Sequence, residues 1–264
     1  MRLPQIYLRC AHRIRRGLSD RLARREFVMR NDKPYISFSF DDFPRSALRI
    51  AGPILKEHGI RATYYASFGL MGQDSPTGRI FLGEDLDLLL AEHHELGCHT
   101  FDHCHAWDTP PSVFEKSVVR NREALLEQVP GGAFKTLSYP LSGPRPATKV
   151  ALSSHFSCCR GGGQTFNEGS IDLNHLRGFF IEQNLGDPDS IREIIERTCQ
   201  ACGWLILATH DVCEQPTRFG CPPNLFADIV GCAARSGASI LPVGSAWEEI
   251  SGTGCAGEAM EQGL

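Results

Sequence analysis

Short apolar runs alternate with longer helix-like runs along most of this chain, and that alternation limits the folds open to it. Strands that alternate with helices are typical of parallel sheets, because each helical crossover returns the chain to the same edge. The expected strands cover 35–40, 62–67, a short run into 99, 133–139, 156–159, 177–181, 204–209 and 239–243, with 246–250 closing the series. The expected helices cover 46–58, 84–96, 113–128, a run from 146, 191–202 and 226–235.

Seven or eight such units predict one α/β domain built as a (β/α) barrel, complete or distorted. A doubly wound open sheet is the alternative. A chain of 264 residues commonly forms one undivided barrel of this kind. We therefore expect a basic, helical N-terminal segment at 1–34, the barrel at 35–250 and a flexible, Gly-rich tail at 251–264. In a barrel, functional side chains are expected just beyond the carboxyl ends of the strands.

The N-terminal segment mixes many arginines with apolar residues, which predicts a basic amphipathic helix. We expect it to be a solvated arm or to pack on the barrel, with peripheral contact to an anionic membrane as the alternative. The formal net charge of -4 argues against a nucleic-acid partner. The segment lacks the apolar core of a secretory signal peptide, and the 11 cysteines do not resemble a disulfide framework. These features together predict a cytoplasmic protein.

Two adjacent carboxylates, Asp41 and Asp42, follow the first expected strand. Two neighbouring residues at the end of a strand can point in different directions and serve different functions. One can bind a metal ion while the other stays unbound, with its proton affinity set by the cation and nearby charges. The alternative is an Asp-Asp turn that caps the following helix.

His99 and His103 lie where the third expected strand ends. Residues four apart lie on one face of a helical turn, so both imidazoles can reach a single divalent ion. Two histidines and one carboxylate leave positions open for water and substrate, as a hydrolytic site requires. The alternative is two polar loop histidines that fall at this spacing by chance.

His210 directly follows the apolar run 204–209. A histidine that leaves a buried strand at this end of a barrel can act as general acid or base near neutral pH. A structural histidine is the alternative, but the position agrees with that of the other two clusters. All three clusters follow strands whose carboxyl ends should converge.

The order and spacing of these motifs resemble the NodB-homology polysaccharide deacetylase family over residues 35–243. The residues that carry the resemblance are Ser39-Phe40-Asp41-Asp42, His99-Thr100-x-x-His103, a Pro-containing loop and a strand end with Leu-x-x-His210. The resemblance implies that Asp42, His99 and His103 bind one divalent ion, zinc first, with cobalt or another ion possible in its place. It further implies that Asp41 is the general base, which activates water for attack on an acetamide, and that His210 is the general acid.

The third family motif normally contains an Arg followed by prolines and a Tyr, and this chain departs from it. The best match is Ser138-Tyr139-Pro140-Leu141, which lacks both the Arg and that Tyr. We expect this loop, through Tyr139 and Leu141, to contact substrate and to supply a backbone N–H for the oxyanion. Arg160, at the end of the fifth expected strand, is a candidate to replace the missing Arg beside Asp41; a surface or structural Arg is the alternative.

The carboxylate that orients the catalytic histidine in the family has no obvious match. Asp172 is one candidate, with Asp211 or a helix-capping role for Asp172 as alternatives. The resemblance as a whole implies an enzyme that removes the N-acetyl group of an N-acetylhexosamine in an oligosaccharide, polysaccharide or lipid-linked precursor. The alternatives are a glycan-binding barrel without turnover and a hydrolase of a non-sugar amide.

Overall fold

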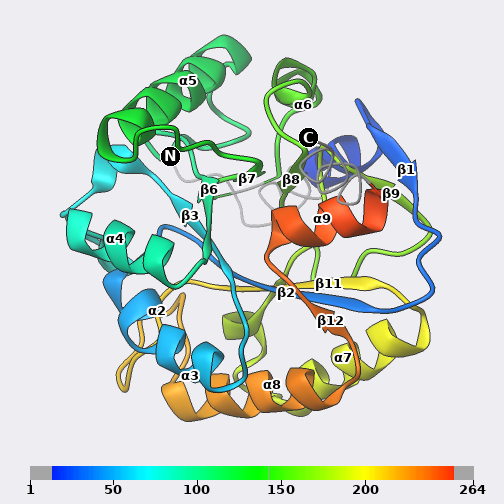
Figure 1. Cartoon of the computed structure of the whole chain (residues 1–264). Coiled ribbons are helices and arrows are strands. Elements are labelled where there is room, and N and C mark those ends of the chain that lie inside the picture. Colours follow the sequence, from blue (N-terminus) through cyan, green and yellow to red (C-terminus); the bar gives the residue numbers. More distant parts are fainter. Residues whose placement is uncertain (1–13, 142, 253–264) are drawn as a thin grey trace, which may run out of the picture.

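The central feature of the structure, a computed structural model that describes residues 14–141 and 143–252, is one curled parallel sheet. Its strand order is β10-β11-β2-β3-β6-β7-β8, and β12 also pairs with β2. The late strand β11 lies beside the early strand β2, and the sheet curls around an axis instead of forming an open, doubly wound sheet (Figure 1). The predicted distorted (β/α) barrel of seven or eight strands is confirmed.

Strands and helices alternate along the chain as the pattern indicates. The strands are β1 (Glu26–Val28), β2 (Tyr35–Phe40), β3 (Thr63–Ala66), β4 (Asp74–Ser75), β5 (Gly78–Arg79), β6 (Glu95–Cys98), β7 (Thr136–Ser138), β8 (Cys158–Arg160), β9 (Ser170–Asp172), β10 (Phe179–Phe180), β11 (Trp204–Thr209) and β12 (Ser239–Ile240). The helices are α2 (Arg45–Arg49), α3 (Ala51–Glu57), η1 (Phe68–Leu70), α4 (Gly83–Ala91), α5 (Pro111–Gln128), α6 (Pro146–Leu152), η2 (Ile181–Asn184), α7 (Asp189–Gln200), α8 (Pro223–Arg235) and α9 (Val243–Ser251).

Side chains of each strand alternate between the outer and inner faces of the curled sheet, as the two-residue period of a strand requires. In β11, Leu205 and Leu207 join the core under the helices, whereas Trp204 and Ile206 join a second core cluster inside the barrel. Inside, the Trp204 indole N–H donates to Ser37 of β2 at 3.0 Å. Continuing this alternation beyond the ends of β2 and β11 brings positions 41 and 210 to the inner face.

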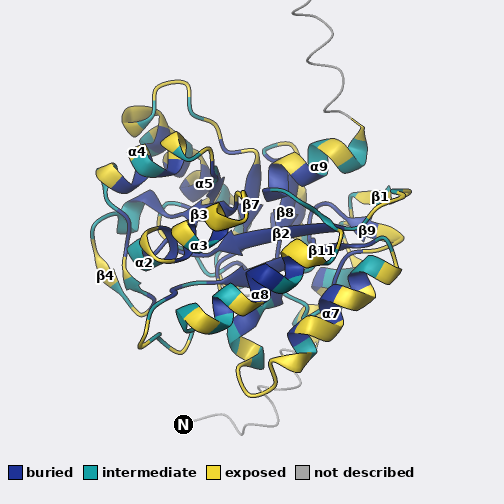
Figure 2. Cartoon of the chain, turned by 60° about the horizontal axis from the view of Figure 1, so that its bottom comes forward, coloured by how far each residue is buried: buried dark blue, intermediate teal, exposed yellow. Residues whose placement is uncertain are grey.

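The helices cover the outer face of the sheet. The buried side of α8 carries Phe226, Ile229, Val230 and Ala233, and its other side is exposed (Figure 2). Phe226 packs edge-on against Phe38 of β2, with ring centroids 5.8 Å apart. Helix α8 therefore buries one apolar stripe against the sheet, which is why its apolar residues follow the helical period.

The amino end of the barrel is closed by α9. Val243 and Ala246 pack with Tyr35 and Trp204, the first residues of β2 and β11. The Val243 N–H also donates to the Thr63 hydroxyl at 2.8 Å. Because this end is filled, an open cleft is left for the carboxyl end of the strands.

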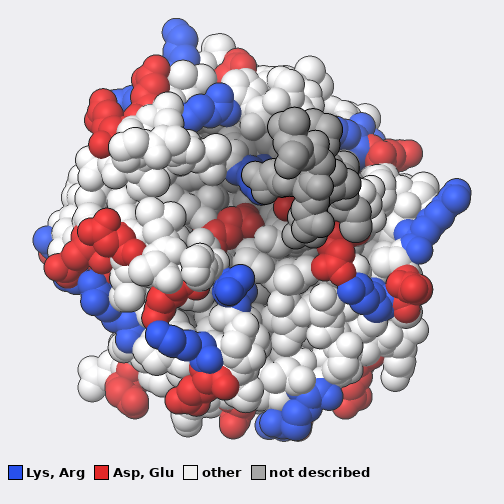
Figure 3. All heavy atoms as spheres, viewed as in Figure 1, with Lys and Arg blue, Asp and Glu red and all other residues white. Residues whose placement is uncertain are grey.

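Charged side chains of both signs are interspersed over the face seen in Figure 3. This mixture agrees with the small net charge of -4 over the whole chain. No helix within the described ranges is both long and apolar enough to cross a bilayer.

Three expected elements differ from the structure. The helix expected at 46–58 is divided into α2 and α3 at Ile50. The helix expected at 84–96 ends at Ala91, because His93 takes a left-handed conformation (φ 57°) and the chain then forms β6 beside β3. The run 246–250 is part of α9, where it faces the amino end of the barrel. Residues 253–264 of the expected tail lie outside the described part of the chain.

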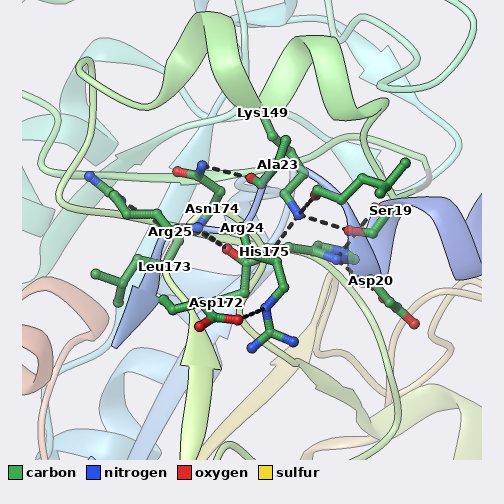
Figure 4. A network of polar contacts seen from close by, with 12 residues as sticks. Ser19, Asp20, Ala23, Arg24, Arg25, Lys149, Asp172, Leu173, Asn174 and His175 are labelled. Carbon is green, nitrogen blue, oxygen red and sulfur yellow. Dashed lines mark hydrogen bonds and ion pairs between the residues drawn. The ribbon is translucent and has the colours of Figure 1, made fainter. Parts of the chain in front are cut away.

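The N-terminal segment is not separate from the barrel, at least from residue 14 onward. Residues 14–21 form a helix, and β1 pairs antiparallel with β9, so described residues before the expected boundary at residue 34 pack on the barrel. The fully buried Lys149 fixes this arrangement. Its ammonium donates to the carbonyls of Ser19 and Leu22 at 2.8 and 2.7 Å, and to Asp172 at 2.6 Å (Figure 4). Of the two expectations for this segment, packing on the barrel holds for the described residues.

Candidate active site

The polar residues singled out in the sequence meet in one cleft at the carboxyl end of the strands. Asp41 and Asp42 follow β2, His99 and His103 follow β6, and His210 follows β11, and all five line this cleft. The cleft has a volume of about 810 Å³, within the range of sites that take small molecules. The parallel strands explain the convergence, since all their carboxyl ends lie at one edge.

Asp42, His99 and His103 have the geometry of a metal site. The Asp42 Oδ1 atom lies 3.3 Å from the His99 Nε2 and 3.0 Å from the His103 Nε2. Two ligand atoms bound tetrahedrally to zinc at about 2.0 to 2.1 Å are about 3.3 Å apart, so these spacings fit one ion. Within the described residues this is the group of three His, Cys or acidic side chains close enough to share a metal.

The surroundings of the three ligands orient them for a cation. The His99 Nδ1 lies 2.8 Å from the Ser138 carbonyl, so it carries the proton and leaves the Nε2 lone pair toward Asp42. The Thr77 hydroxyl donates to Asp42 Oδ2 at 3.0 Å. Asp42 Oδ1 is buried and accepts no hydrogen bond within the described structure, and such an atom is costly unless a cation or another donor reaches it. The residues present therefore fit a divalent ion.

Electrostatics favour the ligand form of Asp42. Burial alone would raise the pKa of this carboxyl, but His103 and His99 outweigh burial and hold the pKa well below its ordinary value. Asp42 and His103 also take left-handed backbone angles (φ 61° and 50°), which are uncommon for residues other than glycine. Such conformations persist where the surrounding structure enforces them, often at functional sites.

Asp41 is buried against the guanidinium of Arg160. The Arg160 Nη2 donates to Asp41 Oδ1 and, at 2.8 Å, to the Ser138 hydroxyl. Burial would raise the pKa of Asp41, but the charges of Arg160, His99 and His210 outweigh it and lower the pKa. Arg160 comes from β8, so the structure places an arginine from another strand beside Asp41, where the family motif has its own.

His210 is anchored through one ring nitrogen and open at the other. Its Nδ1 lies 3.1 Å from the Phe219 carbonyl and 3.8 Å from Glu182 Oε1. Its Nε2 has no hydrogen-bond partner within the described residues, and the side chain lines the cleft. The imidazole can therefore exchange a proton with a bound molecule through Nε2.

Glu182 is a site residue that the sequence analysis missed. It lies in η2, directly after β10, and burial raises the pKa of its carboxyl to about 8. Its Oε2 is buried and has no partner in the described chain. No family motif marks this position; the only signal in the sequence is an acidic residue shortly after the expected strand 177–181.

Asp172 does not orient His210, and that prediction is wrong. Its Oδ1 accepts the backbone N–H groups of Arg25 and Asn174, each at 3.0 Å, and its Oδ2 pairs with Lys149. Asp211 is likewise occupied, because it holds the loop at Thr217 through the Thr217 N–H and hydroxyl at 2.7 and 2.6 Å. The carboxylate beside His210 is Glu182.

Tyr139 and Leu141 both line the cleft but differ in what they can donate. The Tyr139 N–H donates to the Arg160 carbonyl at 2.9 Å and its hydroxyl to the Asn174 carbonyl at 3.1 Å, so neither is free for an oxyanion. The Leu141 N–H donates to no residue of the described chain. Of the two candidates for the oxyanion donor, only Leu141 remains available.

A comparison with protein families identifies the domain. Residues 29–155 match the model of the family described as polysaccharide deacetylase. This part of the chain is similar to the polysaccharide deacetylase family. The match includes Asp41, Asp42, His99 and His103, and the predicted resemblance to the NodB-homology deacetylase family is thereby confirmed. The comparison with curated proteins found no match.

Solved structures of the same fold extend the likeness beyond the matched residues. A mutant of a CE4-family pseudoenzyme of Bacillus anthracis with restored activity has a TM-score of 0.59 at 10% identity, over 83% of this chain and 69% of its own. The peptidoglycan deacetylase PdaC of Bacillus subtilis has a TM-score of 0.54 at 16% identity, over 88% of this chain and 98% of its own. A family 4 acetyl xylan esterase of Clostridium thermocellum, in complex with a cobalt ion, has a TM-score of 0.54 at 16% identity. This match covers 83% of the present chain and 92% of the esterase. At these identities the likeness shows the deacetylase fold.

Proposed function

We propose that the polysaccharide deacetylase domain of this chain removes the N-acetyl group from an N-acetylhexosamine in a glycan and releases acetate. The observation that carries the proposal is the meeting of Asp42, His99 and His103 with Asp41 and His210 in one cleft. Such a site combines three ligands for a divalent ion with a buried base and a partly buried acid that lines the cleft, which are the parts that amide hydrolysis requires.

The proposed ion is zinc, with cobalt or another divalent ion as an alternative, held by Asp42, His99 and His103. When bound, it would act as a Lewis acid toward the acetyl carbonyl and the attacking water. The cobalt complex of the acetyl xylan esterase supports a metal-dependent site in a protein of this fold.

The roles of the chain's own residues follow from their surroundings. Asp41 is held in its ionised form by Arg160 and would take the proton of the attacking water. The free N–H of Leu141 would donate to the oxyanion that forms on the acetyl carbonyl. His210 would give a proton from Nε2 to the departing amine. Glu182 lies on the Nδ1 side of His210, with its Oε1 atom 3.8 Å from that nitrogen.

Two alternatives have specific support. The first alternative is a barrel that binds glycan without turnover, because the wild-type form of one similar structure is a pseudoenzyme. Against it stands the presence of all five residues in one cleft. The second alternative is a substrate other than a sugar amide, because the acetyl xylan esterase, by its name, acts on an ester. We retain the N-acetylated glycan, and the predicted cytoplasmic location favours a precursor over a finished polymer.

Acetate release from N-acetylglucosamine oligomers tests the proposal. Wild-type protein is assayed after chelation and again after addition of zinc or cobalt, beside Asp41→Asn and His210→Ala. Asp74→Asn is the matched control, because Asp74 is 82% exposed and lies in β4 outside the cleft lining. We expect activity that depends on the ion and is lost in the two cleft variants alone. Activity that survives chelation would refute the metal site, and binding without acetate release would favour the pseudoenzyme.

A further inference from the structure

A loop of three glycines, Gly161-Gly162-Gly163, directly follows β8 and lines the same cleft as the metal ligands. The Gly161 N–H donates to the Leu176 carbonyl at 2.9 Å. The N–H groups of Gly162 and Gly163 donate to no residue of the described chain, and both residues are half-buried. Successive backbone N–H groups left open in this way are a common means of binding anionic oxygens.

Two arginines approach this loop from different segments. The Arg16 Nη2 of the N-terminal helix donates to the Gly163 carbonyl at 3.3 Å. The Arg177 side chain packs so closely on Gly163 that a Cβ there would lie 2.7 Å from the Arg177 Cδ. Gly163 also has φ +150°, which favours glycine. The loop and both arginines therefore form one surface of the cleft.

The charges around the loop leave it positive. Asp20 pairs with Arg177 at 2.8 Å, so two arginines and one aspartate leave one net positive charge beside the loop (Figure 4 shows Asp20 beside His175). Arg16 is exposed and forms no ion pair with the described residues. Since an arginine has five N–H donors, Arg177 also keeps donors beyond the one that reaches Asp20.

We propose that Arg16, Arg177 and the open N–H groups of Gly162 and Gly163 bind an acidic group of the substrate, a phosphate or a carboxylate, while its acetyl group lies at the metal ligands. This inference rests on the proposed deacetylase function and specifies its substrate class as an anionic acetylated sugar. It also explains why the N-terminal helix is held against the barrel by Lys149: the helix supplies Arg16 to one wall of the cleft.

Calorimetric titration of the metal-free protein of residues 1–264 tests the subsite, since without metal an anion has no divalent cation to bind at the three ligands. The probes are N-acetylglucosamine 1-phosphate, glucuronate and neutral N-acetylglucosamine. We expect one of the two acids to bind at least about tenfold more tightly than the neutral sugar, as charge-assisted hydrogen bonds allow. Tighter binding of the phosphate probe or of the carboxylate probe then identifies which acidic group the subsite binds.

The variants Arg16→Gln and Arg177→Gln should each reduce that preference by about tenfold. Arg192→Gln is the matched control, because Arg192 is 55% exposed, pairs with Asp189 on α7 and does not line the cleft. If Arg177→Gln fails to fold, the exposed Arg16→Gln still decides the question. Equal binding of acidic and neutral sugars, or a preference that survives in the arginine variants, would overturn the subsite. Because the titration needs no turnover, its result is independent of whether the protein releases acetate.

Discussion

Replacing Glu182 with Gln should change how the stability of the protein depends on pH. The carboxyl has an ordinary pKa of 4.5, and burial raises it to about 8 in the folded chain. An acid whose pKa is raised on folding stabilises the folded state when it is protonated. That contribution is fully present below pH 4.5 and is lost as the pH rises toward 8.

The size of the effect follows from the two pKa values. The gap between 4.5 and about 8, at about 1.4 kcal/mol per pH unit, corresponds to about 5 kcal/mol as an upper bound. The charge of Asp41 acts in the same direction, and Arg160 opposes it. A glutamine has the same shape and stays neutral, so Glu182→Gln should lose this dependence on pH.

The assay is urea unfolding of wild type and Glu182→Gln at intervals from pH 5 to pH 9, in the presence of a chelator so that no cation shifts the carboxyl. We expect the free energy of unfolding of the variant, relative to wild type, to rise with pH by about 2 to 5 kcal/mol. Glu26→Gln is a matched control, because Glu26 is 63% exposed in β1. Parallel stability curves for wild type and Glu182→Gln would refute the reasoning that Glu182 is neutral in the folded protein.

Three further predictions concern the residues around the site. Arg160→Gln should leave Asp41 buried without its cation, and the free energy of unfolding in urea should fall by about 3 to 5 kcal/mol. Because Arg160 lowers the pKa of Asp41, the acid limb of the kcat/KM profile of any folded variant should move to higher pH. An unmoved limb would exclude Asp41 as the base. Gly161→Ala should cost about 1 to 3 kcal/mol, because the added Cβ would lie 2.2 Å from His175 Nε2, whereas Gly186→Ala, with nothing within 4 Å, should be nearly neutral. Zinc at about 100 times its Kd should raise the free energy of unfolding of wild type by about 2.7 kcal/mol and that of His103→Gln by little. Thermal unfolding at a fixed zinc concentration measures this increase. An equal increase in both proteins would mean that zinc binds elsewhere.

The sequence by itself predicted the class of fold and placed five polar residues at strand ends that the structure brings into one cleft. Alternating apolar runs predict parallel strands, and parallel strands have all their carboxyl ends at one edge. Asp41, Asp42, His99, His103 and His210 each follow such a strand closely, so local pattern and general topology together were enough to expect them in one place.

Only the tertiary structure decided which residues support those five. Arg160 reaches Asp41 from a strand 119 positions later, and Glu182 reaches His210 from the end of β10. Asp172, equally plausible from the sequence, is instead held by Lys149 and by the backbone of the N-terminal segment. Which acidic or basic side chain faces a given partner depends on strand order and on the inward or outward direction of each residue. Strand order in turn is set by packing between segments distant in the chain, which no local pattern encodes.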